Sequence, residues 1–283
     1  MPPDTTALRA ELEAALHFLP LSIPKPVLRA VNAALLAEAR TLIDDSLVPN
    51  SSLFAHVLSF RHEVLHHSLR NVLGDRVAYG LFQGMILSHE SAGSHALPRL
   101  IGSYEHELQA PLAARVPACE RVVDLGAAEG WYVVGLARRF GKPVLGFDVS
   151  AEAREIALRG ARANGVEGLV SLEGECAPER LTALARPGTL FIVDIEGAET
   201  ALFGATEPAA LAAADFVVET HGRSALGLVE HFAATHDIEV VWPETRPIAA
   251  YPVLRRLQEI DRAVAQWEGR GVEPWLIFTS RER

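Results

Sequence analysis

Two pairs of polar side chains have types and spacing that suit acid–base chemistry. Asp194 and Glu196 follow one apolar run, and Glu219 and His221 follow another. Side chains two apart on an extended segment point the same way, and adjacent parallel strands end at one edge of a sheet, so we expect the pairs to meet. An imidazole titrates near neutral pH, and a nearby carboxylate stabilises the imidazolium. The predicted chemistry is removal of a hydroxyl proton by His221, with Asp194 or Glu219 as its partner.

Metal binding is an alternative for the same side chains. Two carboxylates and an imidazole suit Mg²⁺ or Mn²⁺, and such an ion would lower the pKa of a bound hydroxyl. The ligands would be Asp194, Glu219 and His221. Glu196 and Glu199 have a simpler interpretation, in which they only place negative charge at the first turn of the next helix. For Glu199 we adopt that interpretation.

A turn of small residues follows an earlier apolar run. Gly126, Ala128 and Gly130 would let the backbone approach a ligand closely, and the next helix would offer free N–H groups. Asp124 lies two residues before the turn, and Asp148 lies 24 residues after Asp124, at the end of the next predicted strand. A carboxylate at that place can accept hydrogen bonds from ribose hydroxyls. The pattern predicts a site for a nucleoside cofactor.

The residues of the turn discriminate between two such cofactors. Set on Gly126, the dinucleotide pattern G-x-G-x-x-G would place Trp131 where close helix–strand packing needs a glycine. An acid at Asp124 would repel a pyrophosphate but could hold an ammonium group. S-adenosylmethionine (SAM) carries an ammonium and a sulfonium, so the turn favours SAM over NAD. Glu175 lies just past the third predicted strand, where an acid could accept from the adenine amino group.

The elements that position these residues fall into two sets. Apolar residues at helical spacing predict helices between Pro24 and Asp45 and again up to Gly74. From about residue 120, short apolar runs alternate with helical segments, which is typical of βαβ units. The predicted strands are 121–125, 144–147, 169–172, 190–193 and 216–218, then 238–241 and 275–279, with one helix over 253–267. We predict an α/β fold with a Rossmann-like, doubly wound, mostly parallel sheet and an N-terminal helical extension.

Several segments carry a resemblance to a known family. The stretch Asp194-Ile195-Glu196-Gly197-Ala198-Glu199 resembles the D-[IV]-E-G-x-E signature of the FkbM-like family, and Glu219-Thr220-His221 resembles its E-x-H. Segments 80–85 and 101–105 resemble segments that precede the glycine turn in some members. Together with the glycine turn, these stretches make the chain similar to class I SAM-dependent methyltransferases over roughly residues 78–279, while the first seventy-odd residues match no family pattern. The resemblance implies methyl transfer from SAM to an oxygen of a sugar, macrolide or other small metabolite. It also implies that Asp124, Gly126, Gly130 and Asp148 contact the cofactor.

This resemblance sets the expected domains. Residues 101–283 would form the methyltransferase domain, and residues 1–100 would form a helical extension that shapes the acceptor site or covers it. N- or C-methylation of a small metabolite stays open, as does a non-catalytic module that binds SAM or a nucleotide. Such a module would need nothing at Asp194, Glu219 or His221.

The net charge and the amino-acid composition limit the partners and the location that we expect. The formal charge of −10 would repel phosphate backbones, so we expect a small-molecule acceptor and no nucleic acid. The apolar runs are too short for a membrane span, and two cysteines suit a reduced, cytoplasmic protein. A homo-oligomer stays open. His62-Glu63-x-x-His66 matches the zinc-protease spacing HExxH, but such a site also needs a third ligand. We therefore interpret these histidines as helix-surface residues or as part of the acceptor pocket.

Overall fold

The computed structural model describes residues 50–87, 96–221, 224–268 and 273–282. The helix predicted between Pro24 and Asp45 lies outside these residues. The chain divides into two compact units. One unit holds a seven-stranded sheet with its helices, and the other holds helices drawn from both ends of the sequence, including residues 246–268.

The sheet confirms the predicted Rossmann-like class. Its strand order is β3-β2-β1-β4-β5-β7-β6, in which β1 to β5 run parallel and β7 runs antiparallel to both of its neighbours. This differs from the dinucleotide-binding order 3-2-1-4-5-6 by one reversed strand inserted between β5 and β6. The strands are β1 Arg121–Leu125, β2 Val144–Phe147, β3 Val170–Glu173, β4 Thr189–Val193, β5 Asp215–Glu219, β6 His236–Val241 and β7 Trp275–Ser280.

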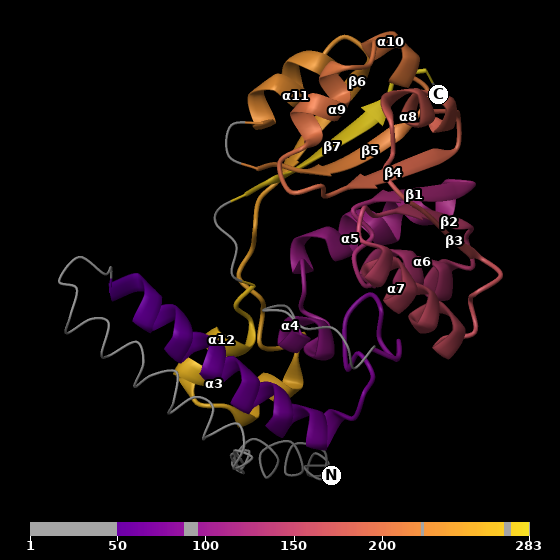
Figure 1. Ribbon diagram of the computed structural model, residues 1–283. Helices are drawn as coiled ribbons and strands as arrows, with labels where there is room; N and C mark the ends of the chain where they lie inside the picture. Colours follow the sequence, from indigo (N-terminus) through magenta and orange to yellow (C-terminus); the bar gives the residue numbers. More distant parts are fainter. Residues whose placement is uncertain (1–49, 88–95, 222–223, 269–272, 283) are drawn as a thin grey trace, which may run out of the picture. The chain divides into compact units, whose positions relative to one another are not determined.

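Helices cover both faces of the sheet (Figure 1). Those of the sheet unit are α5 His106–Arg115, η1 Val116–Ala118, α6 Trp131–Phe140, α7 Ala151–Ala163, α8 Pro178–Leu184, α9 Glu199–Gly204, α10 Pro208–Leu211 and α11 Ser224–Phe232. On one face, side chains of α8 to α11 join those of the strands in one apolar core, where Phe191 and Phe216 stack with ring centroids 4.7 Å apart. The helices α6 and α7 lie on the other face. Apolar strands covered on both sides explain the uninterrupted apolar runs in the sequence.

The register of the sheet aligns the ends of its central strands. Leu125 on β1 pairs with Val193 on β4, and Val193 pairs with Val218 on β5. The residues that follow these three positions therefore emerge side by side at the carboxyl edge. That edge is where an open α/β sheet binds its ligands.

The helical unit is held by polar contacts between distant segments. It contains α3 Asn50–Leu73, α4 Ala96–Ile101, η2 Pro252–Arg256 and α12 Glu259–Ala265. Arg61 on α3 donates from Nε and Nη2 to the two carboxylate oxygens of buried Asp261 on α12, at 2.7 and 2.8 Å. The prediction of one helix over 253–267 was wrong, because the backbone is extended at Leu257 and separates η2 from α12. None of the described helices is long and apolar enough to cross a membrane.

Candidate functional site

The turn after β1 has the backbone that its glycines predict. Gly126 and Gly130 have φ of +92° and +94°, in the left-handed region that favours glycine. A Cβ at Gly126 would lie 1.7 Å from the carbonyl oxygen of Asp194, so the turn packs directly against the residue that follows β4. A Cβ at Gly130 would lie 2.9 Å from that of Ala157 on α7. Packing within the protein therefore requires glycine at both positions, whether or not a ligand binds at the turn.

Asp148 holds this turn from the next strand. Its Oδ2 accepts from the backbone N–H of Ala128 at 2.8 Å, and its Oδ1 accepts from that of Ser150 at 2.8 Å. Asp148 is half-buried. A carboxylate offers about four acceptor positions, so two bonds leave room for ribose hydroxyls. The position therefore fits the predicted role.

Asp124 is a buried acid on β1 with an unused acceptor. Its side chain is 2% exposed, and no described residue bonds its Oδ2. Burial raises the pKa of Asp124 well above its usual range, and the charges of Asp194, Glu105 and Asp148 raise it further. A cationic group brought to this place would relieve that repulsion. Asp124 thus fits the ammonium of a SAM-like ligand.

Glu175 lies exposed in the loop that follows β3, two residues beyond the strand. It occupies the same carboxyl edge as the turn and Asp148. The structure gives its side chain no contact with either, so the adenine role stays a prediction.

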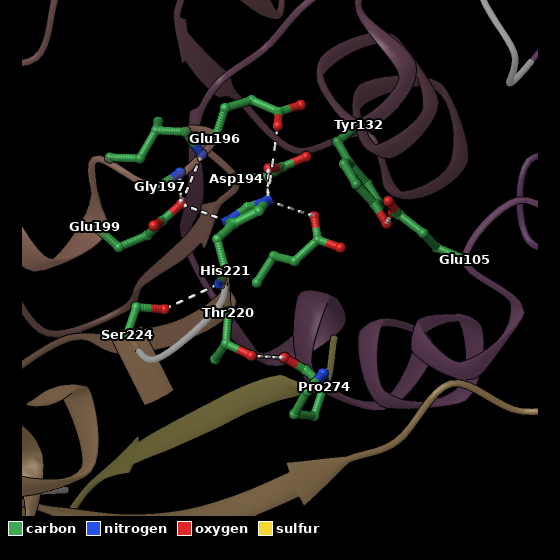
Figure 2. A network of polar contacts seen from close by, with 12 residues as sticks. Glu105, Tyr132, Asp194, Glu196, Gly197, Glu199, Thr220, His221, Ser224 and Pro274 are labelled. Atoms are coloured by element: carbon green, nitrogen blue, oxygen red, sulfur yellow. Dashed lines mark hydrogen bonds and ion pairs between the residues drawn. The ribbon is translucent and has the colours of Figure 1, made fainter. Parts of the chain in front are cut away.

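His221 lies at the centre of a group of carboxylates that come from three segments (Figure 2). Its Nε2 lies 3.7 Å from Asp194 Oδ1, 3.8 Å from Glu196 Oε2 and 4.0 Å from Glu219 Oε2. The structure therefore brings together both pairs that the sequence singled out. These separations exceed hydrogen-bond length, so Nε2 is not hydrogen-bonded to any of the three carboxylates.

The other ring nitrogen of His221 meets an acid that sequence reasoning set aside. Nδ1 lies 3.0 Å from Oε1 of Glu199, the first residue of α9. Glu199 is fully buried, and the same oxygen accepts from the backbone N–H groups of Ile195 and Gly197, both at 3.2 Å. The partner of His221 at Nδ1 is thus Glu199, whereas Asp194 and Glu219 lie near Nε2. The signal that could have found it was the last glutamate of the D-[IV]-E-G-x-E stretch.

Backbone strain gathers around this edge. Three non-glycine residues in the described part of the chain have positive φ: Glu105 at 46°, Ala128 at 44° and Glu196 at 53°. Ala128 belongs to the glycine turn, Glu196 faces His221, and the charge of Glu105 raises the pKa of Asp124. The side chain of Glu105 contacts the hydroxyl of Tyr132, near the start of α6 (Figure 2). Such strain is commonly kept where a site needs it, and sequence reasoning did not assign Glu105 a role.

The donor set of Asp194, Glu219 and His221 fits a divalent cation. One ligand atom from each lies within 4.8 Å of the other two, and no other group of three or more such residues is found in the described ranges. Burial raises the pKa of Asp194, and the charge of Glu196 raises it further. Asp194 Oδ1 is buried and accepts no hydrogen bond from the residues that the structure describes. A cation would satisfy that oxygen and offset the crowded negative charge.

The histidines of the HExxH motif lie in the helical unit. His62 is buried on α3, so the prediction of a helix-surface position was wrong for this residue, and His66 is half-buried. Burial lowers the pKa of His66, with further lowering by Arg70 and His67.

Comparison with known proteins gives no matching family model and no matching curated protein. Solved structures do match. The O-methyltransferase TomG from Streptomyces achromogenes, in complex with SAM, is 18% identical over 66% of this chain and 87% of that chain, with a TM-score of 0.41. The C-terminal domain of precorrin-6Y C5,15-methyltransferase from Rhodobacter capsulatus is 17% identical over 61% and 86%, with a TM-score of 0.40.

An rRNA methylase from Streptococcus thermophilus is 12% identical over 62% of this chain and 95% of that chain, with a TM-score of 0.41. These likenesses concern the fold alone.

Proposed function

We propose that the protein is a SAM-dependent methyltransferase that acts on a hydroxyl of a small molecule of the sugar or natural-product type. One observation carries the proposal. Gly126 packs against the carbonyl of Asp194, so the turn suited to a nucleoside adjoins the cluster suited to activating a hydroxyl. The D-[IV]-E-G-x-E and E-x-H stretches support a place near the FkbM-like family, and both lie in this cluster.

The chain offers a contact for each part of SAM. The ribose would bind at Asp148, the ammonium at Asp124 and the adenine amino group near Glu175, while Gly126, Ala128 and Gly130 would allow close approach of the backbone. When bound, SAM supplies an electrophilic methyl group on a sulfonium. The acidic surroundings of Asp124 suit the positive charge of this cofactor.

The cluster would prepare the acceptor. His221 Nε2 would take the proton of the acceptor hydroxyl and leave its oxygen nucleophilic. The resulting imidazolium would be stabilised through Nδ1 by Glu199, at 3.0 Å, and through Nε2 by Asp194 and Glu219. The proton thus moves from the acceptor oxygen to a base that is already oriented.

A divalent cation, Mg²⁺ or Mn²⁺, is a second way to activate the hydroxyl at the same place. The convergence of Asp194, Glu219 and His221 favours it. Such an ion supplies Lewis acidity that lowers the pKa of a coordinated hydroxyl. These side chains would then hold the ion, and the outer contact of His221 with Glu199 would orient its ring.

Charge and cysteine usage support the remaining parts of the proposal. The formal charge of −10 favours a small-molecule acceptor over nucleic acid. Cys119 and Cys176 are free thiols, which accords with a reducing, cytoplasmic location. Transfer to nitrogen or carbon is an outcome that the product analysis below would detect.

The test begins with cofactor binding. Titration calorimetry of the full chain should show binding of SAM and of its product S-adenosylhomocysteine, and none of NAD. Binding of NAD in place of SAM would contradict the proposal. Radiolabelled SAM offered with panels of sugars and macrolides should then give an O-methylated product by mass spectrometry. A product methylated on nitrogen or carbon would correct the acceptor, and SAM binding with no transfer to any acceptor would favour a non-catalytic module.

A further inference from the structure

The position of Glu199 differs from that of a glutamate that only places charge at the N-terminus of its helix. It is the first residue of α9, yet its side chain has no exposed surface. Its Oε1 faces Ile195 N, Gly197 N and His221 Nδ1, which belong to the loop before the helix and to the segment after β5. A carboxylate that served the helix dipole alone would gain nothing from burial, which is costly unless hydrogen bonds compensate. The contacts indicate a role outside α9.

The first consequence concerns the loop between β4 and α9. Glu196 has φ +53° and Gly197 has φ +95°, so the chain reverses sharply there. The bonds from Ile195 N and Gly197 N to Glu199 fasten the loop on both sides of Glu196. Glu196 is thereby held with Oε2 3.8 Å from His221 Nε2, although its side chain is 89% exposed. Glu199 therefore shapes the edge of the cluster.

The second consequence concerns the proton of His221. Oε1 of Glu199 already accepts from the backbone N–H groups of Ile195 and Gly197, so we infer that it is also the acceptor in its 3.0 Å contact with His221, and that Nδ1 carries the hydrogen. In a neutral imidazole the lone pair then resides on Nε2, the nitrogen that faces Asp194 and Glu219. This is the form needed to take a proton, and equally the form needed to coordinate a cation. The opposite tautomer would point a hydrogen into the cluster.

We propose that Glu199 is a positioning residue that fixes His221 in its Nδ1–H tautomer and fastens the Glu196 loop beside it. The consequence for activity rests on the proposed function, but the tautomer and the loop belong to the protein alone. His221 would use Nε2 in both cases, either as the base that takes the hydroxyl proton or as a ligand of a cation. Glu199 touches neither acceptor nor cofactor and acts through His221.

The direct test is nuclear magnetic resonance of the ¹⁵N-labelled full chain at a pH where His221 is neutral. The ring nitrogen shifts distinguish a protonated nitrogen from an unprotonated one, and His221→Ala assigns the signal. The wild type should show a protonated Nδ1. In Glu199→Ala, the ratio of the Nδ1–H to the Nε2–H form should fall by about tenfold or more, which corresponds to the loss of one hydrogen bond to a charged group.

Further variants separate positioning from a general loss of structure. Glu199→Gln keeps an oxygen for the two backbone donors, so Ile195 and Gly197 should stay protected from hydrogen exchange, whereas Glu199→Ala should lose that protection. Glu259→Ala is the matched control, because Glu259 is also the first residue of a short helix but is exposed. The signals of His236, which contacts Thr235 and the carbonyl of Ala214, serve as an internal reference.

The outcomes are distinct. An Nε2–H tautomer in the wild type, or an unchanged tautomer in Glu199→Ala with its fold intact, would overturn the inference. So would an equal change in the His236 signals, since that would indicate a general loss of structure. Calorimetry with S-adenosylhomocysteine is read separately: the wild type and Glu199→Ala should bind it equally. Absence of binding in both would overturn the proposed function and leave the tautomer result standing.

Discussion

Asp148 fixes the turn after β1 through one hydrogen bond, from the backbone N–H of Ala128 to Oδ2 at 2.8 Å. The bond crosses from the end of β2 to a residue whose φ of +44° is unfavourable for a side chain with a Cβ. The carboxylate thus shapes the turn before any ligand arrives. It also keeps acceptor positions for one.

Replacing this acid should weaken cofactor binding. We expect Asp148→Ala to raise the Kd for S-adenosylhomocysteine by about tenfold to a hundredfold, the loss of one charge-assisted contact of roughly 1.5–3 kcal/mol. Calorimetry on the purified variant measures this. Asp237→Ala, at an exposed aspartate on β6, is the control and should bind as the wild type does. Equal affinities for the Asp148 variant and the control would remove Asp148 from the cofactor site.

Gly126 should tolerate no side chain. A Cβ there would meet the carbonyl oxygen of Asp194 at 1.7 Å, and the backbone has φ +92°. Gly165 is the control, because it has φ +68° but a Cβ there would meet nothing within 4 Å. Gly165→Ala should therefore lower the free energy of unfolding only through its left-handed backbone conformation, by about 1–2 kcal/mol. We expect Gly126→Ala to lower the free energy of unfolding by an additional ~1–3 kcal/mol through the clash. Urea denaturation of both variants gives the comparison, and equal losses would contradict the predicted clash.

The sequence predicted the strands better than their arrangement. The runs around Val123 and Phe191 are buried on both faces, and these two strands begin and end within one residue of the predicted positions. The half-exposed strand β6 begins two residues before its predicted start. The antiparallel placement of β7 between β5 and β6 could not be predicted, because it depends on pairing between segments far apart in the chain. The break at Leu257 was missed, since apolar residues continue at helical spacing through it.

The site was predictable where it depends on strand geometry. Asp194 and Glu219 each lie at the end of a strand, and adjacent parallel strands end at one edge, so their meeting followed from the pattern. The contact between Glu199 and His221 depends on a reversal at Glu196 and Gly197, and local sequence rules do not specify such a reversal. Glu199 was therefore interpreted only as a negative charge at the first turn of the next helix.

The raised pKa of Asp124 predicts how the free energy of unfolding depends on pH. Its folded-state pKa is raised, first by burial and then by neighbouring acids, so the folded state binds this proton more tightly than the unfolded state does. Its ionisation therefore destabilises the fold as pH rises from the unfolded value near 3.8 towards the folded pKa. We expect Asp124→Asn to gain stability relative to the wild type across that window. Urea denaturation from pH 4 to pH 8 tests this, and parallel curves would contradict it.

The thiol of Cys176 should react slowly with alkylating reagents. Burial raises its pKa to about 11. At pH 8 only about one thiol in a thousand would be ionised, and the thiolate is the reactive form. Alkylation by iodoacetamide, followed by mass spectrometry, should therefore accelerate about tenfold per pH unit between pH 8 and pH 10. Rapid labelling at pH 7 would contradict the raised pKa of this thiol.

The cation route makes a prediction that does not need an acceptor. If Asp194, Glu219 and His221 hold an ion, the full chain should bind Mn²⁺, and the electron paramagnetic resonance signal of free Mn²⁺ should fall on titration with protein. Asp194→Asn and Glu219→Gln each remove a charged ligand and should weaken binding by at least about tenfold, and Glu199→Gln, which alters an outer contact, by about 10–100-fold. Glu259→Gln should bind as the wild type does. If the wild type leaves the Mn²⁺ signal unchanged, the cluster works without a cation and His221 is left as the base. If the wild type binds Mn²⁺ and the variants Asp194→Asn and Glu219→Gln bind it equally well, the ion lies outside this cluster.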